Sequence, residues 1–269
     1  YGLPAPKGLL IVGIPGTGKS LTAKATASAF NLPLLRLDMG RVFGGIVGQS
    51  EANLRSVIQT AEAIAPCVLW IDEIEKGFSG SKSSGSTDGG TSSRVFGSFL
   101  SWMQEKRQPV FVVATANDVS QLPPEFLRKG RFDELFFVDL PDATERAQIW
   151  DIVINRCGRQ SANYDPAALS RSCEQFTGAE MEAVFIDALH EAYAENREPA
   201  HADILSAITR TVPLAQLMDG QIATLRQWAR GRAREAGKAI TPRDTNTAGT
   251  ASTATPTAAR MLRRGARNN

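Results

Sequence analysis

The stretch GIPGTGKS, residues 13–20, carries residue types that can hold a triphosphate, and it matches the pattern G-x-x-x-x-G-K-[ST] without a gap. In this pattern, successive backbone N–H groups surround the phosphates, and glycines permit a close approach that a Cβ would block. Lys19 would reach the β and γ phosphates, and Ser20 would ligate Mg²⁺. The residues expected to bind ATP are Gly13, Ile14, Pro15, Gly16, Thr17, Gly18, Lys19, Ser20 and Leu21.

Two acids follow the apolar run CVLWI, residues 67–71, which has the composition of a buried strand. Asp72 would hold Mg²⁺ through water as the acidic partner of Ser20, and Glu73 would polarise the attacking water. A lone Asp-Glu pair is also compatible with a solvated strand end. The separation from the phosphate loop favours catalysis, because open α/β sheets bind ligands at the carboxyl ends of their strands.

An uncharged polar side chain follows the next apolar run, VFVVAT at 110–115. Asn117 would orient the water against the γ phosphate, although Asn-Asp pairs are also common in turns. Gly13, Asp72 and Asn117 each end a predicted strand, and parallel strands would bring them to one edge of a sheet. This convergence favours a catalytic role for Asn117.

Strand and helix patterns alternate through the first half of the chain. Short apolar runs bounded by turn residues predict buried parallel strands, and helical apolar spacing predicts helices between them. The predicted strands cover 8–12, 34–38, 67–71, 110–115 and 135–138, and the predicted helices cover 19–30, 50–65 and 94–106. The alternation predicts an α/β fold, namely a parallel sheet of the P-loop NTPase type with helices on both faces, followed by a small all-α lid.

Helix-start signals replace the strand signals after Pro141. They are Asp142 with Glu145, Asp165 before Pro166, and Thr177 with Glu180. The predicted domains are a nucleotide-binding core at 1–141, a helical lid at 142–212, a C-terminal helix at 213–237 and a disordered basic tail at 238–269. Residues 79–93 contain no apolar side chain, so we also expect that segment to be unstructured.

The composition is that of a globular protein, with 42% hydrophobic and 22% charged residues in a chain of 269. The net charge of +2 is unevenly spread, because residues 238–269 carry six basic side chains and one acid. This tail is either a solvated extension or a weak contact for nucleic acid or an acidic protein. Cys67, Cys157 and Cys173 lack metal-ligand spacing and indicate buried thiols of a reducing compartment. No apolar run approaches the roughly 20 residues of a membrane helix.

Four ordered motifs resemble those of AAA+ ATPases, and of the AAA clade in the narrower sense. PKGLLIVGIPGTGKS resembles the Walker A segment, VLWIDE resembles Walker B, ATAND resembles sensor 1, and LPPEFLRKGRFDE resembles the second region of homology. FGGIVGQSE, PCVLWIDE and RQWARGRA resemble more closely a poorly characterised cyanobacterial and plastid-encoded AAA family, known as a hypothetical chloroplast reading frame. The resemblance extends from Tyr1 to Val212.

The resemblance implies roles for residues outside the phosphate loop. Arg128 and Arg131 would be arginine fingers, which project from one subunit toward the γ phosphate of the next and neutralise charge in the transition state. Two surface arginines on a short helix are the alternative. The arginine-finger role requires a homo-oligomer, expected to be a hexameric ring. Gly178 and Ala179 would place the N-terminus of a lid helix against the nucleotide.

The chain departs from the family pattern at three points. Ile46, Val47 and Gly48 occupy a pore-loop position where many AAA translocases have an aromatic residue, and Phe43 is either a substitute or a core residue. Val153 stands where many relatives have a histidine near the adenosine. The N-terminal part of the AAA domain, which usually helps to hold the base, is not in these residues, so we expect weak nucleotide binding.

The sequence favours a Mg²⁺-dependent ATPase that assembles as a ring and remodels an unidentified protein partner. An alternative is a nucleotide-gated regulatory module with slow hydrolysis and no threading, which the aliphatic pore loop and the Gly/Ser-rich 79–93 segment favour. A nucleic-acid-linked ATPase is a weaker alternative, because only the basic tail supports it. No membrane partner is expected. The compartment would be the cytoplasm, or the plastid stroma if the gene is plastid-encoded.

Overall fold

The computed structural model describes residues 5–39, 42, 49–81, 89–128 and 130–237, and it describes no side chains within 78–94. These residues form two compact units. The sheet unit contains residues up to Gly13, then Lys19–Phe137, and the chain from Gly231 onward. The helical unit contains Ile14–Gly18 and Val138–Arg230, so the phosphate loop is grouped with the helices that follow the sheet.

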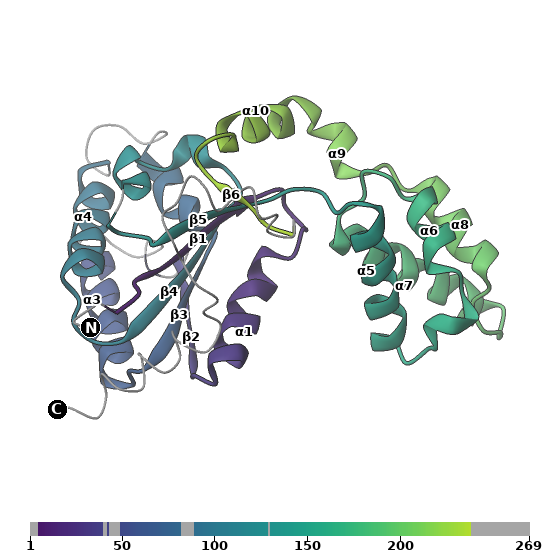
Figure 1. The fold of residues 1–269 in the computed structure, drawn as a ribbon, viewed down its shortest axis with the longest axis horizontal. Helices are drawn as coiled ribbons and strands as arrows, with labels where there is room; N and C mark the ends of the chain where they lie inside the picture. The colour runs from purple at the N-terminus through teal and green to yellow at the C-terminus, as the bar shows by residue number, and fades with distance from the viewer. Residues whose placement is uncertain (1–4, 40–41, 43–48, 82–88, 129, 238–269) are drawn as a thin grey trace, which may run out of the picture. The chain divides into compact units, whose positions relative to one another are not determined.

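A six-stranded sheet forms the centre of the sheet unit, with strand order β2-β3-β4-β1-β5-β6 (Figure 1). The strands are β1 (Gly8–Gly13), β2 (Leu34–Asp38), β3 (Cys67–Asp72), β4 (Val110–Ala116), β5 (Glu134–Val138) and β6 (Arg234–Glu235). The β2–β3, β3–β4, β1–β4 and β5–β6 pairs are parallel. Every residue of β4 is buried, as expected for a central strand covered on both faces. The predicted α/β fold class is confirmed.

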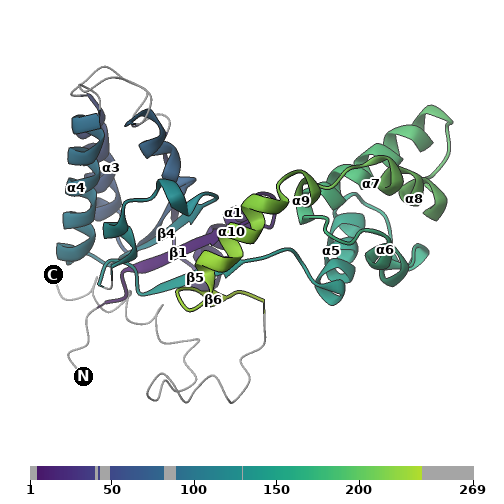
Figure 2. The same ribbon diagram turned by 90° about the horizontal axis from the view of Figure 1, so that it is seen from above.

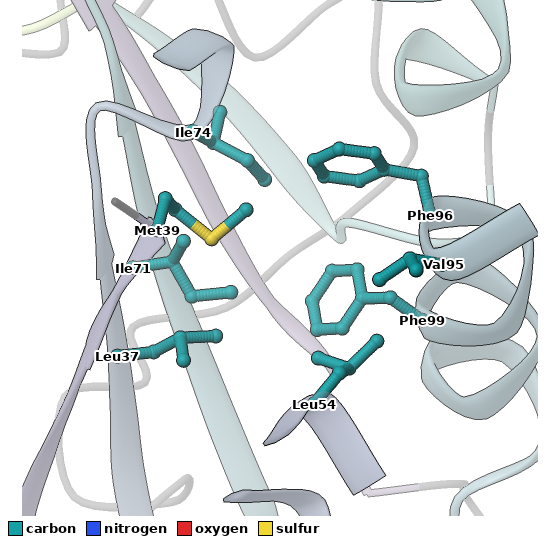
Figure 3. A pocket seen from close by; sticks show the side chains of 8 residues that line it. All are labelled: Leu37, Met39, Leu54, Ile71, Ile74, Val95, Phe96 and Phe99. Carbon is teal, nitrogen blue, oxygen red and sulfur yellow. The ribbon is translucent and has the colours of Figure 1, made fainter. Parts of the chain in front are cut away.

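Helices cover both faces of this sheet, with α1 on one face and α3 and α4 on the other (Figure 1). They are α1 (Lys19–Phe30), α3 (Gln49–Ala63) and α4 (Gly89–Glu105), with 3₁₀ turns η1 (Ile74–Ser81), η2 (Val119–Gln121) and η3 (Pro124–Leu127). Apolar side chains from β2 and β3 face those of α3 and α4 around a cavity of ≈ 10 Å³ (Figure 3). Its lining is Leu37, Met39, Leu54, Ile71, Ile74, Val95, Phe96 and Phe99. A space of this size and lining belongs to core packing rather than to a ligand site.

The prediction that residues 79–93 are unstructured is wrong at both ends of the segment. The η1 turn extends to Ser81, and α4 already begins at Gly89. Residues 82–88 lie outside the described part of the chain. The apolar face of α4 begins only at Val95, but each residue added to an existing helix gains a backbone hydrogen bond. A helix anchored by its packed face can therefore continue into a polar segment that has no apolar signal of its own.

The helical unit has its own hydrophobic core, formed between helices α5, α6, α7 and α8. These helices lie side by side in both views (Figure 1, Figure 2). The helices are α5 (Ala143–Arg156), α6 (Pro166–Ser172), α7 (Gly178–Ala194), α8 (His201–Arg210), α9 (Leu214–Leu217) and α10 (Asp219–Ala229). Trp150 and Phe185 are fully buried in this core. Val153 also lies in it with 3% exposure, so this valine is a packing residue.

The helix-start signals after Pro141 are observed as N-caps. Asp142 and Thr177 each complete a capping box with the glutamate three residues later, and Asp165 accepts a hydrogen bond from Ala168 N–H. These bonds satisfy N–H groups that have no partner within their helix. The sequence therefore predicted correctly where α5, α6 and α7 begin.

The predicted C-terminal helix at 213–237 is divided in the structure. Helix α10 ends at Ala229, and Gly231 follows in the left-handed region with φ 73°. The chain then forms β6, whose Arg234 pairs with Phe136 of β5, and the Ala236 N–H donates to the Phe137 carbonyl at 2.8 Å. A glycine with positive φ commonly ends a helix, and the exposed edge of β5 offers hydrogen-bond partners to the chain beyond it.

Two further sequence expectations concern cysteines and membrane helices. Cys67 and Cys173 are buried thiols, and Cys157 is a half-buried one. Burial raises the pKa of the Cys67 thiol to about 11, which keeps it protonated and unreactive. In the described part of the chain, no helix combines the length and hydropathy needed to cross a membrane.

Candidate functional site

The phosphate loop connects β1 to α1 and needs glycine at two positions. Gly16 and Gly18 have φ values of 80° and 91°, which residues with a Cβ rarely adopt. A Cβ on Gly16 would also lie 2.8 Å from Thr177 Oγ1. The Thr17 hydroxyl donates to the Ile14 carbonyl at 2.7 Å and closes the turn. The loop therefore has the backbone conformation that exposes consecutive N–H groups to an anion.

Lys19 opens α1 and is only 6% exposed. Its Nζ donates to the Gly13 carbonyl at 2.9 Å, so the side chain folds back beneath the loop. Burial lowers its pKa to about 8, and the nearby carboxylates, Glu75 foremost, oppose that shift. A buried ammonium group held at the loop is suited to bind the negative charge of a polyphosphate.

The side chains of α1 and β3 meet at the carboxyl edge of the sheet. Ser20 Oγ donates to Asp72 Oδ1 at 2.9 Å, although 52 residues separate them. Thr115 Oγ1, on β4, donates to the same carboxylate oxygen at 2.7 Å. Hydroxyl and carboxylate oxygens are the ligand atoms that Mg²⁺ prefers. The residues at this edge therefore fit a magnesium ion held by Ser20 and Asp72.

Glu73 has an unusual backbone conformation for a residue with a side chain, with φ 50°. Its N–H donates to Thr115 Oγ1 at 3.0 Å, so one hydroxyl is bonded to both acids of the predicted pair. Thr115 is only 1% exposed. Strained backbone of this kind persists where surrounding contacts fix it, and such sites are often functional. The prediction omitted Thr115, although a lone hydroxyl in the apolar strand VFVVATA was a usable signal.

Asn117 follows β4 and contacts two acids of the segment after β3. Its Nδ2 donates to Glu73 Oε1 at 3.0 Å, and its backbone N–H donates to Glu75 Oε1 at 2.9 Å. Lys76 forms an ion pair with the other oxygen of Glu73. The structure thus brings together the acids and the asparagine that the sequence assigned to catalysis. It adds Glu75 and Lys76, which the prediction omitted because their role depends on folding of η1.

Arg36 on β2 is a further side chain that sequence reasoning missed. It stands beside Trp70 in the strand register, and its guanidinium carbon lies 4.7 Å from the centroid of the Trp70 ring. Its NH2 group is 3.5 Å from Asp72 Oδ2. The Arg36 side chain is 59% exposed, so this ion pair contributes little free energy by itself.

The two predicted arginine fingers flank the turn after η3. Arg128 is exposed, and Arg131 is half-buried and donates to the Glu125 carbonyl. Within the described residues, neither arginine joins the hydrogen-bond network of Asp72, Glu73 and Asn117. Asp133, two residues after Arg131, accepts hydrogen bonds from the Lys7 and Gly8 N–H groups, which ties this segment to the start of β1. The arginines thus lie on a loop that hydrogen bonds of Asp133 fix to the start of β1.

The predicted lid contacts lie in the helical unit together with the centre of the phosphate loop. The Ala179 N–H donates to the Gly16 carbonyl at 3.1 Å. A Cβ added to Gly178 would lie 3.7 Å from the oxygen of the same carbonyl. The first turn of α7 therefore packs on the loop. The pore-loop residues Phe43 and Ile46–Gly48, and the basic tail, lie outside the described residues.

Comparisons with known proteins agree with this site. Residues 9–140 match the family described as "ATPase family associated with various cellular activities (AAA)". Proteins named "Uncharacterized AAA domain-containing protein ycf46" are 55% identical in Guillardia theta over 230 residues (85% of this chain, 45% of the relative) and in Pyropia yezoensis over 238 residues (88% and 48%).

A peroxisomal ATPase, PEX6 of Yarrowia lipolytica, is 31% identical over 208 residues, which are 76% of this chain and 20% of PEX6. The chain spans about half the length of the ycf46 relatives that it matches. The parallel sheet, the glycine-rich loop and the acids at the strand ends agree with these similarities. Through its domain at residues 9–140, this chain belongs to the AAA ATPase family.

Proposed function

We propose that the chain hydrolyses ATP to ADP and phosphate with Mg²⁺. The observation that carries this proposal is the hydrogen-bonded network that joins Ser20, Asp72, Thr115, Glu73 and Asn117 beside the buried Lys19. Its members come from three segments of the chain, namely the start of α1 and the ends of β3 and β4, and together they provide a cation, metal-ligating oxygens and a base. A buried cation beside two partly exposed carboxylates at one sheet edge is typical of functional sites.

In the proposed reaction, the loop N–H groups and Lys19 bind the phosphates, and Ser20 and Asp72 hold the metal. Mg²⁺ would neutralise charge on the phosphate oxygens. Glu73 would accept a proton from the attacking water, and the Asn117 amide would orient both the water and the Glu73 carboxylate. Thr115 would fix the directions of Asp72 and Glu73. Gly178 and Ala179 of α7 would lie on the nucleotide side of the loop.

Hydrolysis of ATP by the purified protein is the direct test. Phosphate release should require Mg²⁺ and should stop when EDTA is in excess. A mock preparation from cells that do not express the protein, purified identically, gives the background from contaminating ATPases. Phosphate release at this background rate, measured over a range of protein concentrations and in the full-length protein, would refute the proposal.

Thr115→Val should lower kcat by about 10- to 100-fold, in the range seen when groups that orient ligands are removed. Valine matches threonine in shape but removes the hydroxyl that contacts Asp72 Oδ1 and the Glu73 N–H. Thr115→Ser keeps that hydroxyl and serves as the matched control, with kcat close to that of the wild type. Equal kcat values for the valine and serine variants would show that the hydroxyl has no catalytic importance.

We further propose that the active form is a homo-oligomeric ring, expected to be a hexamer, that remodels a protein partner. Arg128 and Arg131 support the ring. Arg128 is exposed and Arg131 donates to the Glu125 carbonyl, and within the described residues neither side chain bonds to Asp72, Glu73 or Asn117. The similarity to the peroxisomal ATPase PEX6 supports the ATPase part of the proposal. The names of the ycf46 relatives indicate no substrate, so the protein partner is unidentified. We place the protein in the plastid stroma or the cytoplasm.

A nucleotide-gated regulatory module is the second candidate. The ion pair between Lys76 and Glu73 favours it, because it engages the oxygen of Glu73 that Asn117 does not contact and would slow hydrolysis. A threading assay separates the two functions. ATP-dependent unfolding of a folded reporter fused to a substrate would support remodelling, whereas nucleotide-dependent binding without unfolding would support the regulatory module.

A further inference from the structure

We propose that Glu75 is a positioning residue, which fixes the backbone of Asn117 so that its side-chain amide orients Glu73. This inference rests on the proposed ATPase function. Glu75 lies three residues after Asp72 and is 5% exposed. It is not one of the residues that the sequence predicts for catalysis.

The backbone N–H of Asn117 needs a hydrogen-bond partner outside the sheet, because Asn117 lies just beyond the paired residues of β4. The register of β4 with β3 ends at Ala114, and its register with β1 ends at Ala116. The backbone N–H of Asn117 is therefore past the last strand partner on either side. Glu75 Oε1 accepts a hydrogen bond from this N–H at 2.9 Å and replaces the missing strand partner.

The same asparagine also contacts the proposed base. Its Nδ2 donates to Glu73 Oε1 at 3.0 Å, so Asn117 is held by Glu75 at its backbone and holds Glu73 with its side chain. Glu73 and Glu75 are separated by one residue, and both come from the segment after β3. The three residues thus form a closed link between the ends of β3 and β4. A shift of the Asn117 backbone would move the amide away from Glu73.

Charge also favours a carboxylate at this position. Lys19 is buried nearby, and the charge of Glu75 is the largest of the opposing influences that raise the pKa of Lys19. Burial raises the pKa of Glu75, and the hydrogen bond from Asn117 counteracts that shift. Glutamine at position 75 would keep an oxygen that accepts the Asn117 N–H, whereas alanine would remove it.

A double-mutant cycle tests the proposal. Glu75→Ala should lower kcat by about tenfold or more with less than about a threefold change in KM for ATP, since orienting groups act mainly on turnover. Glu75→Gln should recover most of the lost kcat. In an Asn117→Ala background, Glu75→Ala should change kcat by less than about twofold, because its effect acts through Asn117. Glu51→Ala, at an exposed position of α3, is the control for loss of a carboxylate elsewhere.

Amide hydrogen exchange gives a second readout that is independent of hydrolysis. The Asn117 N–H should exchange about tenfold faster or more in Glu75→Ala and close to the wild-type rate in Glu75→Gln. If alanine prevents folding, Glu75→Asp replaces it, because this variant keeps the charge but is one methylene shorter. If the wild type shows no hydrolysis, the proposed function fails, and the exchange rates still decide whether Glu75 anchors Asn117.

Multiplicative losses of kcat in the double variant, or unchanged Asn117 exchange in Glu75→Ala, would overturn the proposal. A purely structural role of Glu75 would lower the melting temperature, and its effect on kcat would be the same with or without the Asn117 amide. Coupling between positions 75 and 117 is therefore the decisive result.

Discussion

Replacing Glu73 with glutamine is expected to lower kcat for ATP hydrolysis by about 10²- to 10⁴-fold, the range typical for loss of a general base. Glutamine has almost the same shape and can still contact Asn117 Nδ2 through its carbonyl oxygen, which replaces the 3.0 Å bond to Glu73 Oε1. It cannot accept the proton of the attacking water. Nucleotide binding should remain, because Glu73 is not one of the residues that cradle the phosphates.

The measurement combines steady-state phosphate release with equilibrium binding of a fluorescent ATP analogue. Glu51→Gln is the matched control, since Glu51 is an exposed carboxylate in an ion pair with Arg55 on α3. That variant should hydrolyse ATP at the wild-type rate. Full activity of Glu73→Gln would exclude Glu73 as the base, and loss of binding together with turnover would point to a structural defect instead.

Arg128→Ala and Arg131→Ala are each expected to lower kcat by about 10³- to 10⁵-fold, as for arginine fingers in other nucleotide hydrolases. The physical reason is the loss of guanidinium charge that neutralises the transferring phosphoryl group. Binding of ATP should change little, because the fingers belong to the neighbouring site. Arg107→Ala is the control, since this exposed arginine lies in the same unit outside the proposed site.

Mixing two inactive variants distinguishes a finger supplied in trans from one that acts on its own nucleotide. An Arg128→Ala subunit keeps Glu73, and a Glu73→Gln subunit keeps both arginines. If rings form from the mixture, sites with Glu73 from one subunit and arginine from the other are complete, and hydrolysis should reappear. A mixture that stays inactive, although light scattering shows mixed oligomers, would show that the arginines do not act across an interface.

The dependence of the wild-type rate on protein concentration also tests whether the arginine is supplied by a neighbouring subunit. Specific activity should rise with protein concentration as rings assemble, and Arg128→Ala should assemble without gaining activity. A monomer that is fully active at every concentration would contradict the need for a neighbour. The assembly mass with and without ATP, measured in parallel, shows whether nucleotide drives ring formation.

Local signals in the sequence were sufficient to predict most of the elements. The strand β2 at Leu34–Asp38 and the helix α1 at Lys19–Phe30 have the predicted bounds, and the caps of α5 and α7 are where their Asp and Thr signals placed them. Turns, caps and helix faces depend on residues within about four positions of one another, so the sequence displays their causes directly. The phosphate loop was recognisable for the same reason.

The convergence of the site was also predictable in part. Asp72 and Asn117 follow buried strands, and the rule that parallel strands present their carboxyl ends at one edge was enough to bring them together. The structure shows this convergence as the bond between Asn117 Nδ2 and Glu73 Oε1. The catalytic roles of these residues, and of the two arginines, stay predictions until the variants are measured.

Other features of the chain depended on tertiary structure alone. Thr115, Glu75 and Arg36 acquire their roles from partners 36 to 43 residues away in sequence. Thr115 and Arg36 both contact Asp72 at the end of β3, and Glu75 accepts the Asn117 N–H. The strand β6 exists because the chain returns to pair with β5, and α4 extends into a polar segment because its packed turns hold it. Sequence by itself determined the local conformations and the chemical groups. The strand order of the sheet decided which of those groups meet, because hydrogen bonds between distant segments form only where the fold brings their atoms within reach.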